Sequence, residues 1–156
     1  MMPNTRDQIR LNKAEQDELL DSVTTLQIAS ILPDGRPHLV PMWFARDDNG
    51  LLVFSTYARS QKIKNLERDA RITALAETGD TYDQVRGLSI EGVAEIIRDA
   101  SITMRTMQLV GARTNRQPRP DINPDHESEP PPIAYKRVTV RIKPERIRSW
   151  DHRKLA

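Results

Sequence analysis

The sequence contains no cysteine and few aromatic residues. Of its 156 residues, two are tryptophan, three are tyrosine and two are phenylalanine. The absence of cysteine excludes disulfide bonds, thiolate metal sites and a cysteine nucleophile. A chain of this length can still bury one hydrophobic core without covalent help, so we expect a single domain spanning residues 1–156.

Long hydrophobic runs are also absent. No stretch approaches the roughly 18 apolar residues of a membrane-spanning helix. The first 20 residues carry charges throughout and have no apolar core of the kind found in a secretory signal. We therefore expect a soluble, cytoplasmic protein that does not interact with a membrane.

Neither sign of charge dominates the composition. The 24 basic and 22 acidic side chains leave a formal net charge of +2, which does not produce the basic face that nucleic-acid binding requires. A few converging arginine and lysine side chains would instead suit a small anionic ligand. We predict no nucleic-acid partner.

Familiar catalytic and metal-binding motifs are missing. The three histidines, His38, His126 and His152, are scattered along the chain. No dinucleotide-binding glycine pattern, phosphate-binding loop or nucleophile elbow occurs. We therefore predict no metal site.

Short apolar stretches separated by turn signals predict a mainly β protein. Strands are expected at residues 24–32, 37–45, 51–56, 71–76, 88–98 and 135–142. Turns at residues 33–35 and 47–50 would join the first three strands into an antiparallel meander. Gly92 is expected to mark a bulge. Six mostly antiparallel strands are best closed into a barrel, because closure removes exposed sheet edges.

Three short helices and one long loop complete the predicted elements. Helices are expected at residues 12–20, at 60–69 with Ser60 as the N-cap, and from about 99 to 110. Residues 111–132 are rich in proline, arginine, asparagine and aspartate, so they predict an exposed, partly disordered loop. Such a loop is either a lid over a functional site or a surface insertion.

The stretch Phe54–Asn65, FSTYARSQKIKN, follows a strand and opens a helix. Its hydroxyl groups and helix N-terminal amides could hold a phosphate, and Arg59 and Lys62 could neutralise it. A polar loop followed by a capped helix, with no ligand, fits the same spacing.

Two tryptophans form a second feature. Trp43 on the second predicted strand and Trp150 near the end of the chain could border a planar ring, or could fill the core. The basic residues His152, Arg153 and Lys154 could reach the anionic part of a ligand, or could form a solvated terminus.

Four segments, taken in order, resemble a known family: ASILPDGRPHLVPMWF, LLVFSTYARSQKIKNLERDARITALAE, LSIEGVAEIIRD and RIKPERIRSWDHRKL. Their order is similar to that of the pyridoxamine 5′-phosphate oxidase-like superfamily, and within it to the flavin/deazaflavin oxidoreductases. The resemblance covers residues 20–100 and 135–155. It implies a six-stranded antiparallel split β-barrel of the FMN-binding type, with short flanking helices. It also implies a homodimer with the cofactor at the subunit interface.

The resemblance implies cofactor contacts from the second strand, the end of the third strand, the following helix and the C-terminal segment. The residues that it implicates are His38, Val40, Pro41, Trp43, Ser55, Thr56, Arg59, Ser60, Gln61, Lys62, Asn65 and Trp150.

Two positions depart from the oxidases and one pair matches the deazaflavin members. The serine-arginine-lysine triplet of the oxidases corresponds here to Ser60, Gln61 and Lys62, so glutamine replaces arginine, although Arg59 lies nearby. Gly87 stands where the oxidases have a glutamine. Deazaflavin members often use a lysine and an asparagine at the helix start, which Lys62 and Asn65 match.

The resemblance therefore implies an oxidoreductase that transfers a hydride between coenzyme F420, a deazaflavin, and a small conjugated substrate. FMN is the alternative cofactor. A non-catalytic flavin or haem carrier, and a small β-barrel interaction module without a cofactor, remain open.

Overall fold

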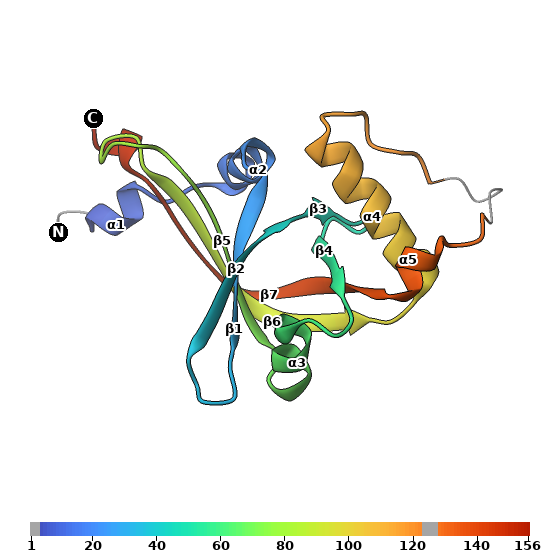
Figure 1. Cartoon of the computed structure of the whole chain (residues 1–156). Helices are drawn as coiled ribbons and strands as arrows, with labels where there is room; N and C mark the ends of the chain where they lie inside the picture. Colours follow the sequence, from blue (N-terminus) through green and yellow to red (C-terminus); the bar gives the residue numbers. More distant parts are fainter. Residues whose placement is uncertain (1–3, 123–127) are drawn as a thin grey trace.

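A computed structural model describes residues 4–122 and 128–156 of the chain. Within them, a seven-stranded antiparallel sheet curls into a half-barrel, with helices at its ends and across one face (Figure 1). The strands are β1 (Thr25–Ile31), β2 (Pro37–Trp43), β3 (Ala45–Arg46), β4 (Leu52–Tyr57), β5 (Arg71–Thr78), β6 (Arg86–Ile97) and β7 (Arg137–Asp151). The helices are α1 (Thr5–Gln8), α2 (Lys13–Ser22), α3 (Gln61–Arg68), α4 (Ala100–Thr114), α5 (Pro132–Tyr135) and the 3-10 turn η1 (His152–Leu155).

The mainly β, split-barrel fold class is confirmed, although the sheet has one more strand than the six predicted. The additional strand arises because the predicted strand 37–45 is divided at Phe44 into β2 and β3. The Phe44 side chain is 1% exposed. It turns into the core, and this interrupts the strand.

The predicted meander of the first three strands is wrong. The strand order is β2-β1-β5-β6-β7-β4-β3, so β4 pairs with β7 and not with β2. The chain therefore passes at Phe44 from one edge of the sheet to the other. The end of β2 and the part of β4 that extends beyond β3 border a gap, which we call the split, and no described strand pair joins β2 to β4 there.

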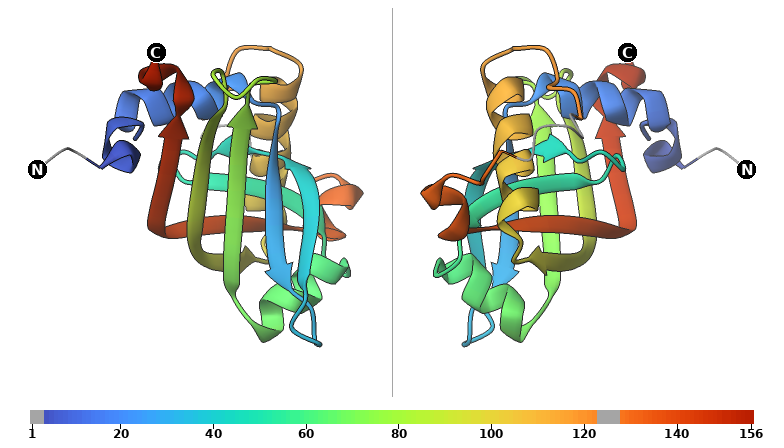
Figure 2. Two further views of the ribbon diagram at one scale, coloured as in Figure 1. Left: turned by 90° about the vertical axis from the view of Figure 1, so that its left-hand side faces the viewer. Right: turned by 90° about the vertical axis from the view of Figure 1, so that its right-hand side faces the viewer.

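The bulge predicted at Gly92 is confirmed, and it explains why β7 is longer than predicted. The register of β6 and β7 shifts between Glu91 and Gly92, and Gly92 then faces Pro144. A Cβ atom at Gly92 would lie 2.2 Å from the carbonyl oxygen of Lys143. The strand bends at this close approach instead of ending at residue 142, and it continues to Asp151; Figure 2 shows the bend.

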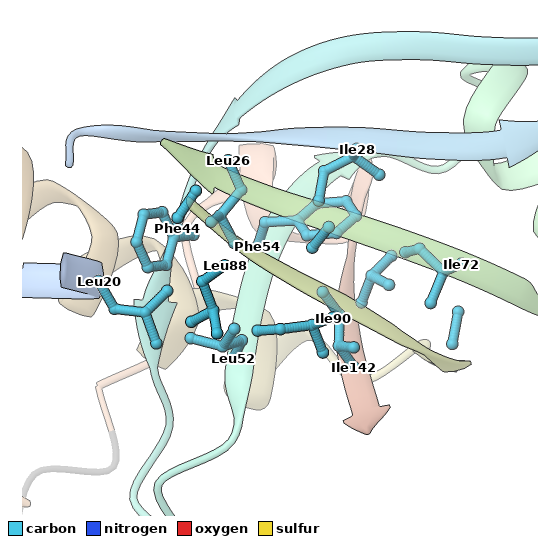
Figure 3. Close-up of a cluster of buried hydrophobic side chains, with 14 of the residues drawn as sticks. Leu20, Leu26, Ile28, Phe44, Leu52, Phe54, Ile72, Leu88, Ile90 and Ile142 are labelled. Carbon is cyan, nitrogen blue, oxygen red and sulfur yellow. The ribbon is translucent and has the colours of Figure 1, made fainter. Parts of the chain in front are cut away.

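The hydrophobic core fills the inside of the curled sheet. Figure 3 shows Leu26, Ile28, Phe54 and Leu88 pointing toward one another from three strands, β1, β4 and β6. Each of these side chains is at most 1% exposed. Leucines of α2 and apolar residues of α3 cover the two ends of this core, so both helices are held by burial and not by propensity alone.

Helix α4 lies across the outer face of the half-barrel, against β3, β4 and β7 (Figure 2). It continues four residues beyond the predicted end because Leu109 and Ala112 are both buried, at 3% and 9% exposure. The start of the predicted loop 111–132 is therefore helical. Residues 115–122 have no helix or strand, and the expected disorder and His126 concern residues 123–127, outside the described part. No helix of the described residues is long and apolar enough to cross a membrane.

Candidate functional site

The split between β2 and β4 leaves two strand edges without a strand partner. Strand β2 pairs only with β1, and β4 pairs with β3 only at Leu52 and Val53. Residues 54–57 of β4 pair on their other side with β7. Backbone groups along both free edges can therefore bond a flat ligand placed in the split.

A cavity of about 340 Å³ lies at this split, beneath α4. We call it the split cavity. Its lining residues are Met42, Trp43, Ser55, Met107, Val110, Gly111, Thr114, Asn115 and Arg137. The fold brings them from β2, β4, α4 and β7, which are far apart in the sequence. Trp43 and Ser55 were predicted from the sequence, whereas the contribution of α4 was not.

Arg137 is a site residue that the sequence analysis missed. It begins β7 opposite Tyr57. Its Nε donates to the Ser55 hydroxyl at 3.0 Å, and its Nη2 donates to the Ser55 carbonyl at 2.9 Å. Its guanidinium also lies 4.6 Å from the centre of the Tyr57 ring. Three contacts thus hold this cation in one orientation beside the cavity.

Lys62 lies in the first turn of α3, close to Arg137. Its Nζ donates to the Thr56 hydroxyl at 3.0 Å. Partial burial, and secondarily the nearby positive charge of Arg137, lower the pKa of Lys62 from its usual value. No salt bridge to either cation occurs among residues 4–122 and 128–156. These are two partly buried cations that have no carboxylate partner in the described residues, which is an arrangement that attracts an anion.

Two hydroxyl groups, those of Thr56 and Ser60, lie beside Lys62. Thr56 is 4% exposed, and its Oγ1 lies 3.5 Å from the Ser60 hydroxyl. Ser60 is confirmed as the N-cap of α3, yet its side chain makes no capping bond. Arg59 and Gln61 are exposed on either side of it. This part of the predicted phosphate cradle is therefore assembled as one cluster.

Asn65 holds the fold together. Its side chain is 0% exposed. Its amide donates to the Ser30 hydroxyl at 3.0 Å and accepts from Gln61 Nε2 at 2.8 Å. The bond to Ser30 joins α3 to β1, and the bond from Gln61 lies within α3. The only predicted residue that lies wholly in the core is thus engaged by its own chain.

The predicted residues of β2 are divided between two faces. His38 and Val40 are half-buried on one face, whereas Pro41 and Trp43 are exposed on the other. The alternation of a strand requires this division. His38 Nδ1 is buried and has no hydrogen-bond partner within the described part of the chain.

Trp150 does not line the cavity that Trp43 lines. Its ring covers Gly87, where a Cβ atom would lie 2.0 Å from Trp150 Cζ2. The two tryptophans therefore do not border one cavity within a single chain.

The C-terminal basic residues are also engaged by their own chain. Arg153 bonds to the Asp151 carboxylate at 2.9 Å and 2.7 Å. Lys154 bonds to Glu15 at 2.7 Å, and His152 Nδ1 lies 2.8 Å from the Tyr82 carbonyl. The basic side chains of the terminus are therefore bonded within their own chain, although residues 153 and 154 are exposed to solvent.

Comparisons with known proteins agree with this fold. The family model described as pyridoxamine 5′-phosphate oxidase matches residues 13–151. The crystal structure of a conserved hypothetical protein from Mycobacterium tuberculosis is 42% identical, covering 96% of this chain and 91% of that one, with a TM-score of 0.83. An F420 reductase is 25% identical, with coverage of 84% and 94% and a TM-score of 0.63.

A putative pyridoxamine 5′-phosphate oxidase from Listeria innocua shares the fold at 23% identity, with coverage of 87% and 95% and a TM-score of 0.61. No curated protein matches the chain. Because the family model extends from α2 to the end of β7, this chain belongs to the pyridoxamine 5′-phosphate oxidase family and has its flavin-binding oxidoreductase fold.

Proposed function

We propose that the protein is an oxidoreductase that binds coenzyme F420 in the split and transfers a hydride between it and a small conjugated substrate. The observation that carries this proposal is the pair of cations, Lys62 and Arg137, that lie together without a carboxylate partner in the described residues. Both F420 and FMN join a flat ring to a phosphate through a ribityl chain. The site offers a counterpart for each of these three parts.

Each part of such a cofactor has candidate contacts. Lys62, Thr56 and Ser60 would hold the phosphate, and Ser55 with Arg137 would hold the ribityl chain or the phosphate. The ring would lie in the split cavity beside Trp43. The free edges of β2 and β4 would bond the polar edge of the ring.

When bound, the cofactor supplies the hydride-transfer chemistry, and the protein supplies orientation and exclusion of water. Met107 and Val110 of α4 cover the split cavity on one side and keep its wall apolar. We predict no essential side-chain acid or base.

The choice of F420 over FMN is supported by the 25% identical F420 reductase and by the lysine at the helix start. The matching asparagine adds less, because Asn65 is buried among its own chain's groups. FMN remains the alternative, since the family model is that of an oxidase for pyridoxamine 5′-phosphate.

An absorbance scan and mass spectrometry of the protein, purified without dialysis, test this choice. F420 absorbs at a shorter wavelength than FMN, and the two differ in mass. We expect F420, and FMN in its place would establish the alternative. A bound cofactor with no turnover on a panel of quinones, enones and tetrapyrroles would indicate a carrier. Failure to bind either cofactor would contradict the proposal.

We also propose a homodimer that covers the exposed face of β2. Leu39 is 64% exposed and Trp43 is 58% exposed, and Pro41 lies between them on the same face of this edge strand. An apolar stripe on a sheet edge favours contact with another copy. Trp43 also lines the split cavity, so a dimer formed there would enclose the cofactor.

Light scattering of wild type and Leu39→Lys tests the dimer. The charged variant should be monomeric and should bind cofactor more weakly. An unchanged dimer would place the interface elsewhere.

A further inference from the structure

A second cavity, of about 670 Å³, adjoins the split cavity along α4. We call it the α4 groove. Its walls are the outer side of α4 and residues 115–122, which follow that helix. Gly111 and Asn115 line both cavities. The two spaces therefore meet at the last turn of α4.

Three charged side chains at the α4 groove are paired with one another, whereas the Asp121 carboxylate, which also lines the groove, has no salt bridge within the described residues. Arg105 donates to the Asp48 carboxylate at 3.1 Å and 2.9 Å, and Arg119 donates to it at 2.6 Å. Hydrogen bonds from Arg105, and then from Arg119, lower the pKa of Asp48 to about 2. Arg105 also donates to the Asp121 carbonyl at 3.2 Å. Arg105, Arg119 and Asp48 are therefore already paired within the protein.

Apart from Asp121, the remaining described lining of the α4 groove is neutral. It consists of the amide side chains Gln108, Asn115 and Gln117 and apolar residues such as Met104, Pro118 and Ile122. An anionic cofactor tail would find no unpaired cation among the described lining residues, whereas Lys62 and Arg137 at the split have no carboxylate partner there. A neutral molecule with an apolar body and a few hydrogen-bonding groups fits this lining.

We propose that the α4 groove binds the distal part of an elongated, uncharged substrate whose conjugated end lies over the ring in the split cavity. Gly111 is then the specificity-determining residue, because it keeps the junction of the two cavities open. A Cβ atom built at Gly111 meets no atom within 4 Å, so the position borders open space. The inference rests on the proposed function.

The test compares Gly111→Leu with wild type, both loaded with cofactor, on two probes. The probes are 2-cyclohexenone and progesterone, which present the same enone ring and differ in the neutral, apolar extension. The leucine side chain would occupy the junction. It should also favour helix formation over glycine, so α4 is expected to stay folded.

Calorimetric titration should show progesterone binding to wild type about tenfold more tightly than 2-cyclohexenone, since the extension is buried. Gly111→Leu should weaken progesterone binding by about tenfold or more, and by at least about fivefold more than it weakens the binding of 2-cyclohexenone. A progesterone derivative with a carboxylate at its far end should bind wild type more weakly than progesterone, because the described lining of the α4 groove holds the Asp121 carboxylate and no unpaired cation.

Ser101→Leu is the matched control, since it adds the same side chain at an exposed position of α4 that lines neither cavity. It should bind both probes as wild type does. Loss of cofactor binding in wild type would overturn the proposed function itself. If cofactor binds but progesterone does not, or if Gly111→Leu affects both probes equally, the α4 groove is not the substrate site.

Discussion

Two basic regions of this chain look alike in sequence and differ in structure. The cluster at the start of α3 and the C-terminal residues 152–154 are both rich in cations. At the terminus, Arg153 is paired with Asp151 and Lys154 with Glu15. At the split, Lys62 and Arg137 bond to hydroxyl and carbonyl groups instead.

The difference shows that anion binding depends on which cations lack a carboxylate partner, and not on how many there are. Asp151 is 2% exposed, so Arg153 serves to compensate a buried charge. Lys62 and Arg137 repel each other and are partly desolvated, which costs the protein without ligand stability. An anionic ligand would remove that cost.

The largest expected effect is at Arg137. Replacing it with alanine should weaken cofactor binding by about 1.5–3 kcal/mol, because a charge-assisted contact is lost. Fluorescence titration with F420 and with FMN measures this change. Arg153→Ala is the matched control and should bind cofactor as wild type does. Equal losses of cofactor affinity in both variants would contradict the distinction between the two basic regions.

Arg153→Ala should instead lower the free energy of unfolding, by about 1–3 kcal/mol, because it leaves the buried Asp151 carboxylate without its guanidinium partner. The hydrogen bond from Arg153 is the main cause of the lowered pKa of Asp151. Because the pKa of Asp151 is lower in the folded protein, its ionised carboxylate stabilises the fold above the unfolded pKa of 3.8. This contribution is lost as the pH falls through the lower, folded pKa. Urea unfolding of wild type should therefore show a loss of stability in acid that is smaller in the variant.

Lys62→Met should change the free energy of unfolding in the opposite direction, when it is measured in the protein without cofactor. The pKa of Lys62 is lowered, so its charged form is less stable in the folded than in the unfolded protein. Removing the charge should raise the free energy of unfolding at neutral pH, by less than about 1 kcal/mol. Wild type should gain stability as the pH rises through the lowered pKa toward 10.5, and the variant should not gain from this group. Lower stability of the variant at neutral pH would show that Lys62 supports the fold.

Asp48→Asn should have the smallest effect on the free energy of unfolding. The variant removes the carboxylate that Arg105 and Arg119 share, but these groups are partly exposed, so we expect a loss of about 0.5 kcal/mol. The contribution should be present above pH 3.8 and should vanish as the pH falls toward the Asp48 pKa of about 2. Thermal unfolding at pH 7 and pH 2 measures it. A change at pH 2 as large as that at pH 7 would contradict the assignment.

Local signals in the sequence predicted most individual elements. The glycine at position 92 marked the bulge, and the helix expected from about residue 99 is present, with Asp99 accepting a bond from the amide of Ile102. Pairing between distant strands carries no such local signal. The connection of β4 to β7, and therefore the split itself, followed only from the resemblance and not from the turns.

The same limit explains the errors at the site. Arg137 enters the site only because β7 pairs with β4 beside Ser55, which its own sequence context does not reveal. Asn65 carries the same side chain whether it faces a ligand or Ser30. The pairing of Trp150 with Gly87 likewise depends on the register of β6 and β7.

The most direct test of the central claim compares FMN with riboflavin, which lacks only the phosphate, in wild type and in Lys62→Met. If the cation pair holds the phosphate, the variant should lose affinity for FMN by about tenfold or more while its affinity for riboflavin stays the same. Equal losses for the two ligands, or none for FMN, would contradict the account.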